Sequence, residues 1–110
     1  MEEYIRIGNG GGFTGIETVF SISRNGQIEQ DGKLVDRLKK TDVEQIITNI
    51  EVLGLDQIEL NQPGNIYKFI EYSMEGKTHR ICWDANSELV NKNLNLYYNH
   101  VHYLIYKLIK

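Results

Sequence analysis

The stretch YKFIEYSMEGKTHRICWD, residues 67–84, decides the fold. Two β-patterned runs flank a Glu-Gly dipeptide, whose glycine tolerates the positive φ angle of a tight hairpin turn. A two-residue turn at this point sets Ile70 opposite Ile81 and Tyr72 opposite His79, so that large side chains pair on one face. The stretch therefore predicts an antiparallel β-hairpin with one apolar side.

A second hairpin is predicted earlier in the chain, at TVFSISRNGQIEQ, residues 18–30. A three-residue loop with Gly26 in a bulge places Ile22 opposite Ile28, whereas a two-residue loop pairs Ile22 with Glu29. Because the first register keeps both isoleucines on the core side, we predict the bulged form. A short apolar strand from Tyr4 to Ile7 precedes this hairpin.

Each hairpin is followed by a segment of helical period. Thr41 and Glu44 have the spacing of a capping box, so we predict a helix from Thr41 to about Leu53, ended by Gly54. The closing segment shows the same spacing of three and four residues. The apolar positions of the two helices are Val43, Ile46, Ile47, Ile50 and Leu53 in the first, and Leu94, Tyr97, Tyr98, Val101, Leu104, Ile105 and Leu108 in the second.

These elements predict a single α+β domain over residues 1–110. Its expected architecture is an antiparallel sheet of two β-hairpins plus a short N-terminal strand, with two helices packed on one face, in the order ββα-ββα. Each hairpin has one apolar face, so both helices should cover the same side and leave the other side in water. The strand order stays open, since two hairpins can join through either edge.

Composition excludes several classes of protein. A chain that is 41% hydrophobic and 25% charged has ordinary globular usage. The net charge is −3 and the Lys and Arg residues are dispersed, so we expect no nucleic-acid binding. The chain has no apolar run long enough to span a membrane and no signal-like start, and Cys82 has no partner for an internal disulfide. These features favour a cytoplasmic protein, not associated with membranes, in which Cys82 is a buried thiol.

No cluster of residues indicates a catalytic or metal centre. His100 and His102 point about 200° apart on a helix, so they cannot chelate one metal ion from one face. Residues 10–15 match G-x-G-x-x-G, but a β-patterned segment follows, so no helix N-terminus is available for a pyrophosphate. We therefore predict a protein that is not an enzyme and that carries no metal or cofactor.

The glycine-rich loop is the candidate partner-binding element, and its residues are Gly10, Gly11, Gly12, Phe13, Thr14 and Gly15. Phe13 either tucks into the core as an anchor, which is the favoured interpretation, or faces a partner. An alternative contact element is the tyrosine-rich helix from Tyr97 to Tyr106, although tyrosines that pack with their hydroxyls in water account for it as well. A homodimer through this helix and a small-ligand-binding domain remain as further alternatives.

The motif Gly11-Gly12-Phe13-Thr14-Gly15, together with the hairpin YKFIEYSMEGKTHRICWD, resembles the emfourin family of small bacterial proteins that inhibit thermolysin-like metalloproteases. The order of strand, loop, hairpin, helix, hairpin and helix is similar along the whole chain. The resemblance implies a protease inhibitor that uses the glycine-rich loop. Independently of the resemblance, we expect a monomer or a homodimer. An inhibitor of this kind requires an ordered loop, because affinity rises when little conformational freedom is lost on binding.

Overall fold

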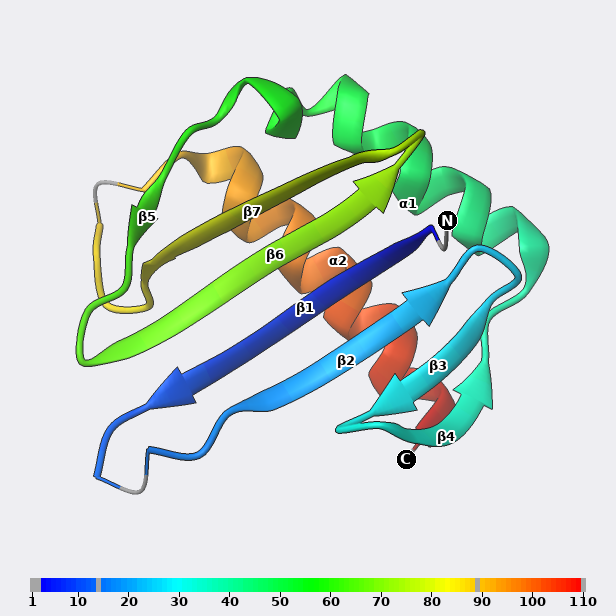
Figure 1. Cartoon of the computed structure of the whole chain (residues 1–110), viewed down its shortest axis with the longest axis horizontal. Coiled ribbons are helices and arrows are strands. Elements are labelled where there is room, and N and C mark those ends of the chain that lie inside the picture. The colour runs from blue at the N-terminus through cyan, green and yellow to red at the C-terminus, as the bar shows by residue number, and fades with distance from the viewer. Residues whose placement is uncertain (1–2, 14, 89, 110) are drawn as a thin grey trace.

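The computed structural model describes residues 3–13, 15–88 and 90–109. Within them it shows an α+β fold of two layers, one twisted sheet and two α-helices (Figure 1). The elements are β1 (Tyr4–Gly11), β2 (Thr18–Ser23), β3 (Gln27–Gln30), β4 (Lys33–Arg37), α1 (Lys40–Val52), a 3₁₀ helix η1 (Leu55–Gln57), β5 (Asn61–Gln62), β6 (Ile66–Met74), β7 (Lys77–Asp84) and α2 (Lys92–Ile109). Among these residues no helix combines the length and apolar character needed to cross a membrane.

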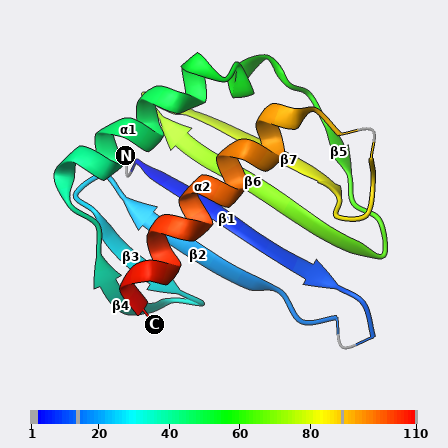
Figure 2. The ribbon, with the colours of Figure 1, turned by 180° about the vertical axis from the view of Figure 1, so that it is seen from behind.

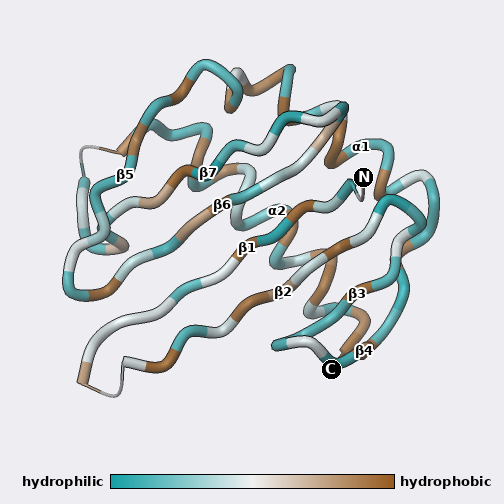
Figure 3. The backbone as a smooth tube through the Cα atoms, in the orientation of Figure 1, coloured by the Kyte–Doolittle hydropathy of each residue, from teal (hydrophilic) through white to brown (hydrophobic). Residues whose placement is uncertain are grey.

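β1 lies at the centre of the sheet, whose strand order is β4-β3-β2-β1-β6-β7-β5. It pairs antiparallel with β2 on one side and with β6 on the other, so it joins the two hairpins (Figure 1). The predicted N-terminal strand is correct in position but too short, because the strand continues past Ile7 to Gly11. The alternation of apolar and polar side chains that predicts a strand stops after Ile7, because glycines follow it. In Figure 3 this end of β1 is nearly white for the same reason.

Both hairpin registers are confirmed. Ile22 lies opposite Ile28, and Ile70 lies opposite Ile81. In the first hairpin the chain turns at Gly26, which has a φ of +93°. A Cβ atom there would lie 2.4 Å from the main-chain oxygen of Leu38, so both the turn and the close packing require glycine.

The sheet is mixed rather than wholly antiparallel, which corrects the predicted ββα-ββα layout. β4 adds a third strand to the first hairpin, and β5 pairs with β7 in parallel. Most of the side chains of β4 are exposed, among them Leu34 and Val35, so it lacks the alternation that marks a half-buried strand. β5 has only two residues, too few for any period to show.

The start of α1 also differs from the prediction. The helix begins at Lys40, and Lys39 occupies the N-cap position without a side-chain hydrogen bond, so Thr41 is inside the helix and forms no capping box. Leu38 is buried, and its N–H donates to the Gly26 oxygen at 2.8 Å, which fixes the chain just before the helix. At the other end, Gly54 adopts the left-handed conformation and ends the helix as predicted.

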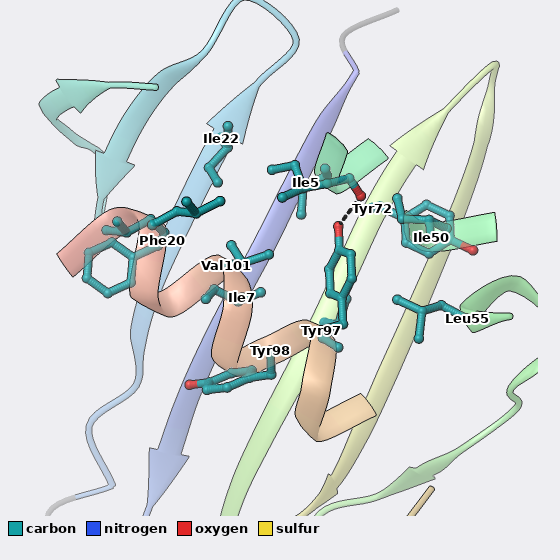
Figure 4. Close-up of a cluster of buried hydrophobic side chains, with 14 of the residues drawn as sticks. Ile5, Ile7, Phe20, Ile22, Ile50, Leu55, Tyr72, Tyr97, Tyr98 and Val101 are labelled. Carbon is teal, nitrogen blue, oxygen red and sulfur yellow. Dashed lines mark hydrogen bonds between the residues drawn. The ribbon is translucent and has the colours of Figure 1, made fainter. Parts of the chain in front are cut away.

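Both helices cover the same face of the sheet, as predicted (Figure 2). The core between the layers holds Ile5 and Ile7 of β1, Phe20 and Ile22 of β2, and the buried side of α2 (Figure 4). The Tyr97 hydroxyl donates to the main-chain oxygen of Ile46 at 2.8 Å and links α2 to α1. Most of the predicted helix positions are buried, whereas Leu108 is 36% exposed.

The face without helices is only partly in water, contrary to expectation. Phe69 of β6 points to this face and is 1% exposed. It lies over Gly8, beside Tyr67, and under the guanidinium of Arg80, whose central carbon is 4.1 Å from the ring centroid. The absence of a side chain at Gly8 makes room for the ring, so an aromatic side chain fills the gap that a strand glycine leaves.

Candidate functional site

The predicted partner-binding residues divide into a strand end and a loop tip. Gly10 and Gly11 belong to β1, where they pair with Tyr67 and Ile66 of β6. A Cβ at Gly10 would lie 2.7 Å from the Tyr67 hydroxyl oxygen, and one at Gly11 would lie 2.1 Å from the Asn65 oxygen. Close packing against Tyr67 and Asn65 therefore accounts for the absence of a side chain at these two positions.

The tip of the loop begins at Gly12. Gly12 and Gly15 have positive φ angles of +78° and +65°, a backbone region that favours glycine. Phe13 between them has a relative exposure of 112%, more than an ordinary extended residue shows. The favoured interpretation of Phe13 as a core anchor is therefore wrong. Thr14 lies outside the described residues.

Both sides of the loop are hydrogen-bonded to the chain around the start of β6. On the β1 side, the Gly12 N–H donates to the Asn65 oxygen at 2.8 Å. On the β2 side, the Tyr67 hydroxyl donates to the Glu17 carboxylate, an acceptor that raises the pKa of this tyrosine. The base of the loop is thus fixed on both sides, while the Phe13 side chain beyond it is fully exposed. The loop lies at the end of the sheet where β1 ends and β6 begins (Figure 1).

Two further exposed apolar side chains belong to this end of the sheet. Ile16 in the loop is 67% exposed, and Ile66 at the start of β6 is 43% exposed. Ile66 adjoins the loop, since a Cβ on Gly12 would lie 3.8 Å from its Cγ1 atom. The sequence analysis did not predict the supporting residues Asn65, Tyr67 and Glu17. The run Pro63-Gly64-Asn65 just before Tyr67 is typical of a turn and is the one local signal that the chain reverses there.

His79, His102 and Cys82 contact neighbouring parts of the fold. A ring nitrogen of His79 is 2.8 Å from the Ile58 oxygen. On α2, the His102 ring stacks on Tyr98 and packs at a tilt against Tyr106. Burial lowers the pKa of His102, and Lys68 lowers it further. Burial raises the pKa of the Cys82 thiol, which disfavours the reactive thiolate. In the part of the chain that the structure describes, no three His, Cys, Asp or Glu side chains are grouped to hold a metal ion.

The tyrosines of α2 have different environments. Tyr97 and Tyr98 are buried, while Tyr103 is 63% exposed. Tyr106 is 40% exposed and packs edge-on against Phe20. Of the four tyrosines between Tyr97 and Tyr106, Tyr103 and Tyr106 are therefore the exposed pair.

A shallow depression of about 500 Å³ opens on the sheet face that the helices leave uncovered. It carries both charge signs, because Arg6 and Arg24 line it together with Glu3 and Glu29. Arg6 already pairs with Glu71 at 3.1 Å and Arg24 with Glu3 at 3.7 Å. The depression therefore lacks the concentrated charge that would select one ligand class.

No protein-family model matches this chain, and the curated proteins include no match to its sequence.

Proposed function

We propose that this chain is a non-enzymatic protein-binding domain that inhibits a thermolysin-like metalloprotease, with Phe13 as the central contact. The observation that carries the proposal is the full exposure of Phe13 at the tip of a loop whose two sides are hydrogen-bonded to the chain around β6. The resemblance of residues 11–15 and 67–84 to the emfourin family supplies the class of partner.

The proposal has a physical basis in the cost of ordering a loop. Glycine-rich segments lose much conformational entropy on binding. Here the bonds to Asn65 and Glu17 already hold the base of the loop in the free protein, so less entropy remains to be lost. An aromatic side chain held in water gains about 1.5–3 kcal/mol when an apolar pocket buries it.

The division of the loop assigns separate roles to its residues. Gly10 and Gly11 support the loop by allowing close contact with Tyr67 and Asn65, and Gly12 and Gly15 provide its left-handed turns. Phe13 supplies the contact itself. In this proposal the partner contacts the loop tip around Phe13, and the end of β1 at Gly10 and Gly11 supports the loop.

The test is an inhibition assay of a thermolysin-like metalloprotease with a fluorogenic peptide substrate and the full chain at micromolar concentration. We expect inhibition by the unaltered chain and at least a tenfold loss of potency for Phe13→Ala, since truncation of a central aromatic contact costs about 2 kcal/mol or more. Tyr103→Ala, which removes an exposed aromatic ring from α2, is the matched control and should keep full potency. Absence of inhibition by the unaltered chain removes the inhibitor function, whereas full potency of Phe13→Ala removes only the role of the loop.

A homodimer through α2 is the second candidate. Leu96 is 59% exposed, and Tyr103, seven residues later, projects from the same side of the helix. Sedimentation velocity of the unaltered chain and of Tyr103→Ala tests this candidate. A dimer that dissociates in the variant supports it, and a monomer at all concentrations excludes it.

A further inference from the structure

A groove at the opposite end of β6 from the Phe13 loop has a distinct chemical character. It lies between the second half of α1, the 3₁₀ helix η1 and the end of β6, and has a volume of about 240 Å³. Its apolar floor includes Ile47 and Met74, and its acidic residues are Glu51, Asp56 and Glu75. A neighbouring concavity of about 580 Å³ shares Asp56 and Met74 with it, so the two form one continuous surface, which we call the acidic groove.

All charged side chains that line the first concavity are acidic. Three carboxylates line it, and no Lys or Arg does. The ion pairs that the structure shows among its described residues involve Glu3, Glu44 and Glu71, none of which lines the concavity. The carboxylates of Glu51, Asp56 and Glu75 therefore form no ion pair with a described residue, and Lys77, the one Lys or Arg that lines the acidic groove, belongs to its second concavity.

Tyr72 gives an independent indication of a ligand. It lines both parts of the acidic groove and is 7% exposed, yet its hydroxyl makes no hydrogen bond to any residue in the described ranges. No fully buried side-chain oxygen or nitrogen in those ranges lacks a partner, so the hydroxyl must reach the groove surface. Figure 4 shows Tyr72 beside Ile50, which also lines the groove. The phenol of Tyr72 is therefore a nearly buried hydrogen-bonding group that lines the groove and has no hydrogen-bond partner among the described residues.

We propose that the acidic groove binds an arginine side chain of a basic segment in a partner protein. The aliphatic stem would lie on Ile47 and Met74, because long cationic side chains bury their methylenes on apolar surface. The guanidinium offers five N–H donors, which suits three carboxylates and a phenol oxygen spread around one cavity. The first concavity is smaller than the roughly 300–1,000 Å³ of typical small-molecule pockets, so it fits one long side chain.

The acidic groove is separate from the Phe13 loop. β6 extends over nine residues between them, from Ile66 beside the loop to Met74 in the groove. Binding of a basic segment therefore does not depend on protease inhibition, and either property can fail without the other.

The experiment is an NMR titration of the ¹⁵N-labelled full chain with a hexa-arginine peptide at low salt. We expect amide shifts confined to residues 47–57 and 72–79, and weaker binding at high salt because the contact is ionic. Glu51→Gln and Tyr72→Phe should each weaken binding about threefold or more, the size expected for loss of one contact of this kind. Glu44→Gln, which makes the same charge change on another part of α1, should leave the affinity unaltered.

Three results would overturn the proposal. The first is the absence of shifts at millimolar peptide. The second is a set of shifts spread over the whole surface or centred outside the acidic groove. The third is binding of hexa-lysine that equals that of hexa-arginine and is insensitive to Tyr72→Phe, which would show attraction by net charge alone. A hexa-glutamate peptide serves as the negative control and should cause no shifts.

Discussion

Tyr97 of α2 donates its hydroxyl hydrogen to the main-chain oxygen of Ile46 in α1 at 2.8 Å, within a core where both residues are at most 1% exposed. This polar contact links the two helices within the apolar core that they share above the sheet (Figure 4). The ring of Tyr97 fills the core as an apolar group, and its hydroxyl adds a specific partner.

Tyr97→Phe should lower the free energy of unfolding by about 1–2 kcal/mol, because the Ile46 oxygen loses one of its partners in a buried setting. Urea denaturation followed by circular dichroism measures the change. Tyr103→Phe removes a hydroxyl from an exposed ring and should leave the midpoint unchanged. Equal midpoints for Tyr97→Phe and the unaltered chain would show that the contact contributes nothing to stability.

Stability should fall steeply above pH 10. Burial raises the pKa of Tyr97 above its ordinary value of 10.0, so the folded state holds this proton at a pH where the unfolded chain has released it. Stability is therefore unaffected by this group below pH 10 and declines by up to about 1.4 kcal/mol per pH unit above it. Urea midpoints between pH 9 and 11 test the sign, and Tyr97→Phe should have a shallower slope.

Gly8→Ala should destabilise the protein by about 1–3 kcal/mol, the usual cost of overpacking. The new Cβ would lie 2.5 Å from the Phe69 ring and 2.5 Å from the Thr18 oxygen, and the backbone oxygen cannot move aside cheaply. Thermal denaturation gives the measurement. Ser21→Ala, on the same face in the neighbouring strand, is the control and should change the midpoint little.

Glu71→Gln should cost about 1 kcal/mol and lose most of its effect at high salt. The Glu71 carboxylate accepts hydrogen bonds from the Tyr4 hydroxyl at 2.8 Å, from Arg6 at 3.1 Å and from Arg80 at 3.3 Å. Both arginines are more than 40% exposed, so solvent screens the attraction and keeps its contribution small. Urea denaturation of both proteins at low and high NaCl measures how much of the stability difference is ionic. A stability difference that does not change with salt would contradict this account.

Phe13→Ala should leave the unfolding midpoint unchanged, because its ring is fully exposed and packs on nothing in the core. Thermal denaturation of the purified variant measures this. A fall in midpoint would mean that Phe13 packs against the protein in solution, as the anchor interpretation held. The same measurement shows whether a loss of inhibition by this variant reflects lost contact or lost folding.

Local signals in the sequence determined both hairpins and both helices. Turn residues such as Gly26 and Gly76 select the loop type, and the loop type sets which residues face each other, so Ile22 with Ile28 and Ile70 with Ile81 followed from a few neighbouring positions. The helical period of three and four residues depends equally on near neighbours.

Tertiary structure alone decided the strand order, the extra strands and the environment of Phe13. β4 is exposed and β5 is short, so neither has a periodic signature. β1 continues through glycines because it pairs with β6, whose Phe69 and Tyr67 side chains pack against Gly8 and Gly10. The acidic groove combines residues 47–57 with residues 72–79, which are separated along the chain. Such sites follow from packing between distant segments, and a pattern that repeats over a few residues carries no information about that packing.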